Sequence, residues 1–384
     1  MHAAVSNPPP LRVAIVCDLL EERWPSMDLV ADELQRTLPS VSAPRVTPTR
    51  LRPAMPAWPA TIARLSGIRA AQNANRYLDR HLRYPRWLRK HATGFDAYHV
   101  VDHTYAHLVH ELPADCTIVT CHDVDAFRCL FDPAGEPRSP LFRRMAERVL
   151  RGLQRAAIVS CDSVATRDAL VQHGLRSHRL EVVPLGVHPA FTPGPAASVG
   201  SPQEIALLHV GSTIPRKRID VLLRVFARVR AAWPSAQLVR VGGAFTAEQD
   251  ALARSLGVDD AIRVTPSLSH ADLADVYRRA TLVLLPSDRE GFGLPVVESM
   301  ACGTPVVASD LPVLREVGGG VASYAPVGDI DACADTVDRL LRERAQDPSH
   351  WSVRRAAGLA QSSAFSWERC AARMAGLYAE VAGG

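Results

Sequence analysis

Short apolar runs rich in β-branched residues alternate with helical segments, and this alternation is the strongest constraint on the fold. The expected strands of the first half are Leu11–Cys17, Tyr98–Val101, Cys116–Thr120, Ala156–Ser160 and Val182–Pro184. Runs of this kind are typical of buried strands in a parallel sheet that helices cover on both faces. The first half of the sequence therefore predicts a doubly wound α/β domain.

A stretch rich in proline and glycine, Phe191–Pro202 (FTPGPAASVGSP), indicates a linker to a second set of alternating elements. The expected strands after it are Ile205–Val210, Gln237–Val241, Ile262–Thr265, Leu282–Leu285 and Val306–Ser309. We expect two Rossmann-like domains, residues 1–190 and 191–365, with a C-terminal helix, residues 366–384, that packs back on the first. Such sheets bind ligands at the carboxyl ends of their strands, so the cleft between the domains is the expected binding site.

The composition is that of an ordinary globular protein. Of the 384 residues, 47% are hydrophobic and 22% are charged, which excludes a disordered or fibrous chain. The sequence has no long apolar run that predicts a membrane-spanning helix and no apolar core of a signal peptide near its start. We expect a cytoplasmic protein, with peripheral contact to the inner membrane face as the alternative. The eight cysteines form no C-x-x-C pair, which favours buried reduced thiols over zinc or disulfide frameworks.

The positive charge of the chain is unevenly distributed. Residues 1–190 hold 24 basic and 19 acidic residues, a net charge of +5, whereas residues 191–384 have a net charge of −1. The excess gathers in Asn75–His91, which contains Arg76, Arg80, Arg83, Arg86, Arg89 and Lys90. This segment is either a solvated helix face or a patch that binds an anionic acceptor or lipid head groups. No nucleic-acid recognition motif occurs, so no nucleic-acid partner is expected.

The most informative stretch is Ser287–Val307 (SDREGFGLPVVESMACGTPVV). Gly291 and Gly293 allow a sharp turn with uncovered amides, and the helix start that follows favours a phosphate. Glu290 and Glu298 are poor partners for phosphate but good acceptors for sugar hydroxyls. The stretch suits a ligand that joins a sugar, a diphosphate and a ribose. The alternative is an ordinary strand–turn–helix with solvated glutamates.

A second candidate site is His209–Asp220 (HVGSTIPRKRID), in which Gly211 opens a loop after a strand. Arg216, Lys217 and Arg218 are adjacent, so they cannot all point the same way. Arginine and lysine at a loop–helix junction suit a diphosphate, and a solvated basic turn is the alternative. Only one other lysine, Lys90, occurs in the chain. The stretch is not a P-loop, because G-x-x-x-x-G-K-[ST] is absent.

A third candidate is Thr120–Asp125 (TCHDVD), which places His122 at the end of an expected strand. Structural and functional roles for this histidine are equally compatible with the sequence. The D-x-D pattern Asp123–Asp125 is typical of metal-dependent sugar transferases, but such short patterns arise by chance and Asp329–Asp331 repeats it. We therefore expect no metal.

Together these motifs resemble the signature of the retaining glycosyltransferases of family 4, the group 1 glycosyltransferases. The string from Glu290 to Val307 is the most specific part, and the segments that agree with it are His122–Asp123, Val183–Val187, Pro215–Lys217 and Phe365–Glu368. The resemblance is good over residues 95–380 and poor over the first 90. It implies the GT-B fold, two Rossmann-like domains that face each other across a cleft.

The resemblance also implies a role for each matching residue. Arg216 and Lys217 would hold the donor diphosphate, Glu298 would bind the ribose, and Glu290 would face the donor sugar. The remaining implied donor-binding residues are Gly211, Ser212, Phe292, Gly293 and Leu294, the last three through backbone amides near sugar and phosphate. His122 would reach the transferred sugar from the first domain.

Two segments depart from the family pattern. Ser212 follows Gly211 where many members carry an arginine, so the second cationic contact to the donor would fall to Arg216 or to backbone amides. The first loop reads Glu21–Ser26 (EERWPS) without the usual glycines, which makes Arg23 and Trp24 candidates for an unusual acceptor or sugar wall.

The expected function is retaining transfer of a hexose from a GDP- or UDP-linked sugar to a hydroxyl acceptor, without cofactor or metal. The acceptor would be a sugar, a glycan or a lipid-linked molecule, as in bacterial polysaccharide or glycoconjugate biosynthesis. A nucleotide-sugar epimerase and a non-catalytic nucleotide-sugar-binding or scaffold protein of the same fold are the alternatives. The base, the sugar, the linkage and the oligomeric state stay open from sequence.

Overall fold

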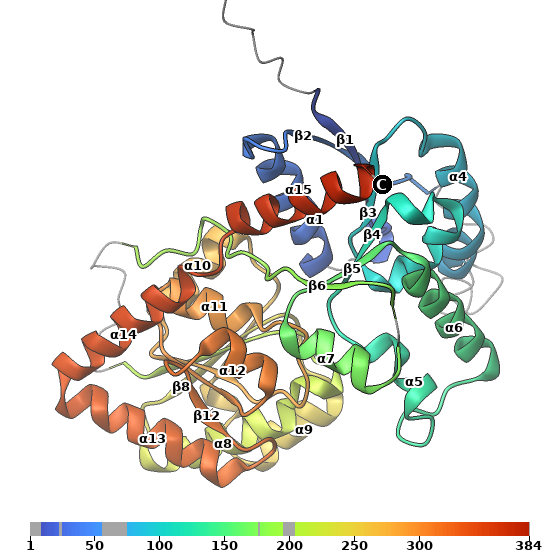
Figure 1. Cartoon of the computed structure of the whole chain (residues 1–384). Coiled ribbons are helices and arrows are strands. Elements are labelled where there is room, and N and C mark those ends of the chain that lie inside the picture. Colours follow the sequence, from blue (N-terminus) through green and yellow to red (C-terminus); the bar gives the residue numbers. More distant parts are fainter. Residues whose placement is uncertain (1–8, 23–24, 56–74, 176, 195–203, 384) are drawn as a thin grey trace, which may run out of the picture. The chain divides into compact units, whose positions relative to one another are not determined.

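The chain consists of two compact units. The computed structural model describes residues 9–22, 25–55, 75–175, 177–194 and 204–383 (Figure 1). Unit 1 comprises Met1–Leu185 and Trp367–Gly384, and unit 2 comprises Gly186–Ser366. The C-terminal helix therefore belongs to the unit that holds the N-terminal half of the chain.

Six strands of the described part of unit 1 form a parallel sheet in the order β2-β1-β3-β4-β5-β6. Their bounds are β1 (Leu11–Val16), β2 (Val46–Leu51), β3 (Ala97–Val100), β4 (Thr117–Cys121), β5 (Ile158–Cys161) and β6 (Leu180–Val182). All residues of β3, β4 and β5 are buried. A strand that is covered on both faces is mostly apolar, which explains the apolar runs in the sequence. The buried polar residues His99, Thr120 and Ser160 hydrogen-bond to one another.

Helices follow most of these strands. Their bounds in unit 1 are α1 (Pro25–Thr37), η3 (Asp79–Arg83, a π-helix), α4 (Tyr84–His91), η4 (His103–Glu111, a 3-10 helix), α5 (Arg128–Phe131), α6 (Pro140–Arg155), α7 (Val164–Gln172) and α15 (Trp367–Gly383). Helix α15 packs beside α1 and against β3 (Figure 1). Its buried Tyr378 hydroxyl lies 2.7 Å from Nδ1 of His99 on β3, which ties the C-terminal helix to the sheet of unit 1.

Unit 2 repeats this architecture with a parallel sheet in the order β12-β11-β10-β7-β8-β9. Its strands are β7 (Ala206–Val210), β8 (Gln237–Val241), β9 (Ile262–Thr265), β10 (Leu282–Leu285), β11 (Val306–Ser309) and β12 (Ser323–Ala325). Its helices are η8 (Pro215–Lys217), α8 (Ile219–Ala232), α9 (Ala247–Ser255), α10 (His270–Arg279), α11 (Leu294–Ala301), α12 (Pro312–Gly318), α13 (Ile330–Gln346) and α14 (Pro348–Ser362). Across the described helices of both units, none is long and apolar enough to cross a membrane.

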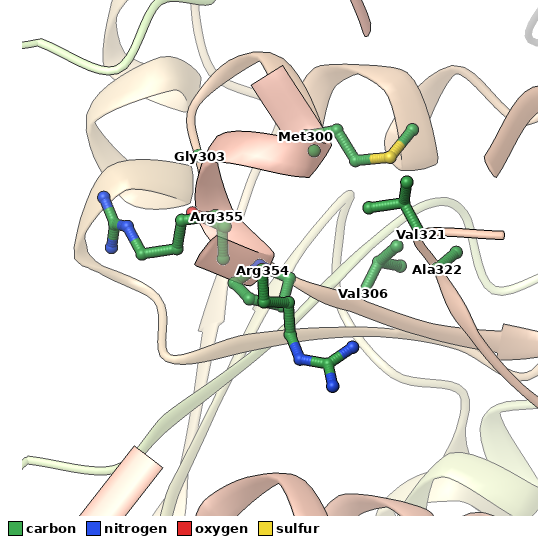
Figure 2. A pocket seen from close by; sticks show the side chains of 10 residues that line it. Met300, Gly303, Val306, Val321, Ala322, Arg354 and Arg355 are labelled. Carbon is green, nitrogen blue, oxygen red and sulfur yellow. The ribbon is translucent and has the colours of Figure 1, made fainter. Parts of the chain in front are cut away.

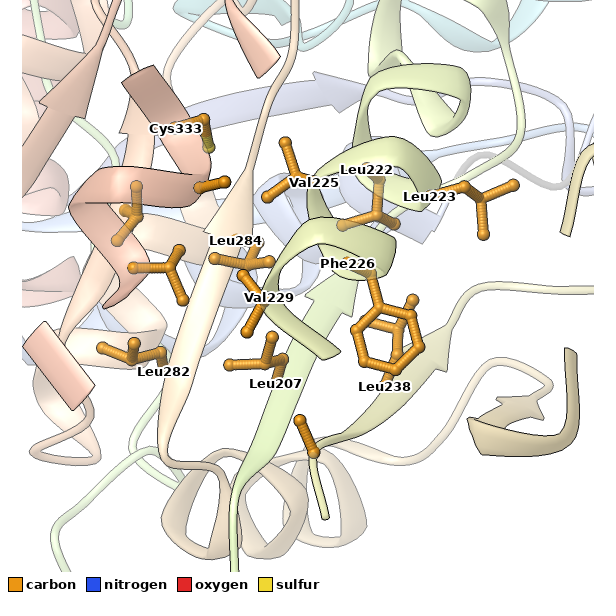
Figure 3. Packing of buried hydrophobic residues seen from close by; sticks show 14 of the residues in the cluster. Leu207, Leu222, Leu223, Val225, Phe226, Val229, Leu238, Leu282, Leu284 and Cys333 are labelled. Atoms are coloured by element: carbon orange, nitrogen blue, oxygen red, sulfur yellow. The ribbon is translucent and has the colours of Figure 1, made fainter. Parts of the chain in front are cut away.

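The core of unit 2 lies between α8, α13 and one face of the sheet. Leu222, Phe226 and Val229 of α8 pack over Leu207 of β7 and Leu238 of β8 (Figure 3). All five are buried, and each contributes ~1.5–3 kcal/mol by removing apolar surface from water. This packing fixes the strands of unit 2, so the loops that follow their carboxyl ends start from fixed positions.

The predicted strands were found, except that β6 (Leu180–Val182) shares only Val182 with the expected Val182–Pro184, and two edge strands were missed. β2 contains Pro48 and alternates buried with exposed residues, so it has neither the apolar run nor the donors of a central strand. β12 has only three residues. Both lie at sheet edges, where one side needs no partner strand and the sequence signal is correspondingly weak.

The cysteines match the sequence prediction. All eight lie in the described part and are free, and all but the half-buried Cys116 are buried. Burial raises the pKa of Cys17 to about 12 and that of Cys333 to about 12. These thiols are therefore inert packing residues.

Close packing of α6 on η4 gives a direct test of the fold. A Cβ on Gly152 of α6 would lie 1.9 Å from the carbonyl oxygen of Ala106, whereas a Cβ on Gly376 of α15 would meet nothing within 4 Å. We expect Gly152→Ala to lower the free energy of unfolding by ~1–3 kcal/mol through overpacking. Gly376→Ala should raise it by ~0.5–1 kcal/mol through helix propensity. Urea unfolding of both variants measures this, and equal effects would contradict the packing.

Candidate active site

Two loops leave the same edge of the unit 2 sheet. Strands β7 and β10 are parallel neighbours, with Leu207 paired to Leu282 and Leu208 to Val283. The loops that follow them, residues 211–218 and 286–293, therefore start side by side at the carboxyl edge. The backbone N–H of Asp288 donates to the carbonyl oxygen of Arg216 over 2.8 Å and joins the two loops. The two most informative sequence motifs thus form one site.

A buried ion pair lies at the centre of this site. Nζ of Lys217 donates to Oε1 of Glu290 over 2.6 Å, and the two side chains are only 10% and 5% exposed. Nη1 of Arg216 lies 3.3 Å from Oε2 of Glu290 and donates to the carbonyl oxygen of Arg289 over 3.0 Å. The cations predicted for a diphosphate and the carboxylate predicted for a sugar are therefore brought together and hold each other.

Arg218 points elsewhere, which confirms that the three adjacent basic residues do not share a direction. Its backbone is left-handed, with φ of 47°. Its guanidinium donates to Asp288 over 2.8 Å and to Asp220 over 2.9 Å. These bonds give Arg218 a structural role, because they brace the end of η8 against the loop after β10.

The loop after β10 ends at a helix start. Gly293 has φ of 97° and directly precedes α11, and a Cβ there would lie 2.6 Å from Leu314. Phe292 is buried and packs edge-on against Phe365, with ring centroids 5.7 Å apart. Leu294 is the first residue of α11. The positive end of a helix thus follows closely on Glu290, which is the arrangement that favours a phosphate.

Glu298 lies on α11, one to two turns beyond this helix start. It is buried, and its Oε2 accepts a hydrogen bond from the hydroxyl of Tyr277 over 2.8 Å. Burial raises the pKa of Glu298 from its ordinary 4.5 to about 7, although the Tyr277 hydrogen bond lowers it. Glu298 is therefore poised between the neutral and the charged form near neutral pH. Sequence reasoning missed Tyr277, which sits in an unremarkable helical pattern.

Gly211 and Ser212 begin the loop after β7. The N–H of Gly211 donates to the carbonyl oxygen of Val241 over 2.9 Å, and Ser212 is exposed. The carbonyl oxygen of Gly211 accepts a hydrogen bond from Arg240 over 2.9 Å. Arg240 was missed at the level of sequence, although an arginine inside the apolar strand QLVRV was a signal.

His122 follows β4 in unit 1 and is buried. Its Nδ1 lies 2.6 Å from Oδ2 of Asp162, and its Nε2 lies 2.7 Å from the carbonyl oxygen of Val101. Burial alone would lower the pKa of His122, but Asp162, its Nδ1 hydrogen bond to that carboxylate, and Asp102 raise it to about 10. Both ring nitrogens of the imidazolium therefore donate within unit 1, and the contact to a sugar stays a prediction.

Neighbouring residues of unit 1 have local roles. Oδ1 of Asp123 accepts from the N–H of Asp125 over 2.9 Å, so the first carboxylate of the D-x-D pattern holds a turn. Arg23 and Trp24, named as candidates for an acceptor wall, lie outside the described residues.

The basic segment Asn75–His91 is partly neutralised within unit 1. Arg80, Arg83 and Arg89 pair with Glu22, Asp79 and Glu111. The segment also has a buried side, because Tyr84 and Leu88 lie in the core. Arg76, Arg86 and Lys90 are exposed. Only part of the charge is therefore presented to solvent.

Two cavities differ greatly in size. One, in unit 1, has a volume of about 550 Å³ and lies between α6 and the start of the basic segment; its walls include Arg76, Tyr77, Arg80, His81, Phe142, Met145 and Val149. Another, in unit 2, measures about 10 Å³ and is lined by residues such as Met300, Val306 and Arg355 (Figure 2). A cavity of that size holds no more than about one water molecule, so it is too small for a ligand, whereas the cavity in unit 1 is large enough to hold one.

The two wound parallel sheets define the GT-B class of architecture, as predicted. Sucrose-phosphate synthase from Thermosynechococcus elongatus matches with a TM-score of 0.73 at 20% identity, over 96% of this chain and 98% of that one. HepE of Anabaena, in complex with UDP and glucose, matches with a TM-score of 0.72 at 15% identity, over 96% and 100%. Likeness at these identities shows the fold alone.

Sequence comparison gives the family. The model of glycosyl transferases group 1 matches residues 197–355, and that of glycosyltransferase family 4 matches residues 38–191. D-inositol 3-phosphate glycosyltransferase of Streptosporangium roseum is 37% identical over 226 residues, which are 54% of this chain and 51% of the relative. The chain belongs to the group 1, family 4-like glycosyltransferases. It spans about half the length of the curated relatives it matches.

The pKa of Glu298 predicts a pH dependence of stability. In the unfolded chain this carboxyl ionises near 4.5, whereas in the folded protein it stays protonated up to about pH 7. As pH rises from about 4.5 to 7 the unfolded state alone loses its proton, so the folded state loses up to roughly 3 kcal/mol of stability. Glu298→Gln removes this loss.

Urea unfolding of the wild type and Glu298→Gln at pH 5 and pH 8 measures the effect. As pH rises, the free energy of unfolding of Glu298→Gln should increase relative to that of the wild type. Tyr277→Phe serves as the matched variant, because losing the hydrogen bond to the carboxylate should make the pH dependence of the wild-type glutamate steeper. Parallel stability curves for all three proteins would contradict a raised pKa at Glu298.

Proposed function

We propose that this chain transfers a hexose from a nucleotide-diphosphate sugar to a hydroxyl acceptor, with retention of the anomeric configuration and without a metal. The observation that carries the proposal is the site formed by Lys217, Arg216, Glu290 and the start of α11. It combines cations and a helix start suited to a diphosphate with carboxylates suited to sugar and ribose hydroxyls.

Donor binding rearranges the central ion pair. Lys217 and Glu290 are nearly buried and neutralise each other. A diphosphate that takes Glu290's place beside Lys217 keeps the cation paired, so no buried charge is left alone on the lysine. The displaced Glu290 carboxylate then accepts hydrogen bonds from the hydroxyls of the sugar that the diphosphate carries. On the other side of the diphosphate, Glu298 accepts a hydrogen bond from a ribose hydroxyl.

The chemistry follows from the charge that develops on the leaving group. The bond between the anomeric carbon and the phosphate oxygen breaks while a bond to the acceptor oxygen forms on the same face. The acceptor proton passes to the leaving phosphate oxygen. The sugar becomes oxocarbenium-like and negative charge grows on the phosphate. Lys217, Arg216 and the helix start are aimed at that charge, and each such preorganised donor is worth ~10²–10³ in rate.

The relatives support a nucleotide-sugar donor, and both UDP- and GDP-linked sugars stay in the proposal. The HepE structure contains UDP and glucose, and the curated relatives are named D-inositol 3-phosphate glycosyltransferase. In the present chain the cavity of about 550 Å³ in unit 1 is the proposed acceptor site, for a sugar, glycan or lipid-linked hydroxyl. The exposed Arg76, Arg86 and Lys90 are the part of the basic segment available to an anionic acceptor or a membrane surface.

Replacing the central cation should slow the transfer, and urea unfolding shows whether the variant still folds. We expect Lys217→Ala to lower turnover at least tenfold, because a donor aimed at the leaving phosphate is lost. The control is Arg339→Ala, which removes an exposed cation of α13 that has no part in the proposed site; this variant should keep the wild-type turnover. Turnover is measured with the donor found by screening UDP- and GDP-linked hexoses for thermal stabilisation, which is ~2.7 kcal/mol at 100 times Kd.

Two outcomes would contradict this role. Unchanged turnover in a folded Lys217→Ala protein would exclude Lys217 from the diphosphate site. A wild type that binds a nucleotide sugar but neither transfers nor hydrolyses it would point instead to a non-catalytic binding protein.

Metal independence has its own test. We expect transfer to continue at the full rate in excess EDTA, because Lys217 and Arg216 supply the positive charge at the diphosphate. The rate is compared with and without EDTA, and then after addition of Mn²⁺ or Mg²⁺. Loss of activity in EDTA that Mn²⁺ restores would overturn the metal-free proposal.

A further inference from the structure

Arg240 is a fully buried cation beside the proposed donor site. It lies on β8, in register with His209 of β7, and its relative exposure is 0%. Its Nη2 donates to the carbonyl oxygen of Gly211 over 2.9 Å, and its Nη1 donates to that of Gly243. One guanidinium therefore ties together the loops that follow two neighbouring strands.

No carboxylate of the described residues forms a salt bridge with Arg240, and its Nε has no hydrogen-bond partner among them. The guanidinium lies over the ring of Phe245, 5.2 Å from the centroid. Burial lowers the pKa of Arg240, and burial is the only cause. Because arginine stays protonated in proteins, the structure retains a positive charge here at a cost in folding free energy.

The tethered loops are packed too closely to shift independently. A Cβ on Gly242 would lie 2.0 Å from the carbonyl oxygen of Gly211, so the two backbones are in direct contact. Gly211 also adjoins the central cation, because a Cβ on Gly211 would lie 3.5 Å from Cε of Lys217. His209, the neighbour of Arg240 in register, carries no compensating charge: burial, together with the charges of Lys217 and Arg240, lowers its pKa to about 3.

We propose that Arg240 is a positioning residue for the donor: it fixes the Gly211 loop beside Lys217 and holds an uncompensated positive charge beneath the place of the diphosphate. This inference rests on the proposed nucleotide-sugar site of unit 2. It explains why a costly buried cation stands at this edge of the sheet: a bound diphosphate supplies the negative charge that the protein does not.

The experiment compares two ligands on matched variants. Calorimetry measures Kd for UDP or GDP, whichever the wild type binds, and for the nucleoside without phosphates. Arg240→Gln keeps an N–H donor for one carbonyl but loses the charge, and Arg240→Lys keeps the charge but loses the fork. Arg263→Met, an exposed arginine on the neighbouring strand β9, is the control. Urea unfolding shows which variants fold.

We expect Arg240→Gln to weaken diphosphate binding at least tenfold and nucleoside binding less than twofold, with Arg240→Lys in between and Arg263→Met unchanged. A folded Arg240→Gln that binds diphosphate within twofold of the wild type would overturn the proposal. Equal losses for diphosphate and nucleoside would also overturn it, because they show general loosening. If Arg240→Gln does not fold, the same comparison of the Kd values for diphosphate and nucleoside on Arg240→Lys decides. If the wild type binds no diphosphate, or binds it no more tightly than Lys217→Ala does, the proposed donor site itself is refuted.

Discussion

The ion pair between Lys217 and Glu290 holds the site together, and most of its surroundings depend on it. The two residues come from different loops, and they meet because β7 and β10 are parallel neighbours whose carboxyl ends share one edge. The backbone bond from Asp288 to Arg216 and the left-handed Arg218 keep those loops in register. A short, nearly dry pair of this kind costs desolvation on both sides. The short contact and the second cation on the same carboxylate, Arg216, offset part of that cost.

The same pair explains how one edge of a sheet can serve a ligand with charged and neutral parts. Lys217 already has an anionic partner in Glu290, so an incoming diphosphate exchanges one anionic partner of Lys217 for another. Glu298 lies further along α11, where it is buried and hydrogen-bonded to Tyr277 of α10, and its carboxyl can accept a hydrogen bond from a ribose hydroxyl. Arg240 then provides the fixed charge behind the loops, which no described carboxylate cancels.

Local patterns predicted the central strands and the start of α11, because each depends on residues close in sequence. The placing of Lys217 and Glu290 in one donor site came from the family resemblance, and the ion pair between them was not predicted. The edge strands β2 and β12 were not predicted, because an edge strand needs neither a continuous apolar run nor hydrogen bonds on both sides. The partners of His122 were not predicted for another reason. Asp162 and Val101 are distant from His122 in the sequence, and only the folded sheet brings their oxygen atoms within 2.7 Å of its ring nitrogens. Arg240 shows that an out-of-place charge in an apolar strand marks a site even without a motif.

The most direct measurement of the central claim is a crystal structure of the protein with UDP or GDP bound. We expect the diphosphate to lie between the Gly211 loop and the start of α11, with Nζ of Lys217 moved from Glu290 to a phosphate oxygen. A diphosphate bound at another edge of the sheet, or Lys217 still paired with Glu290 beside a bound nucleotide, would contradict it.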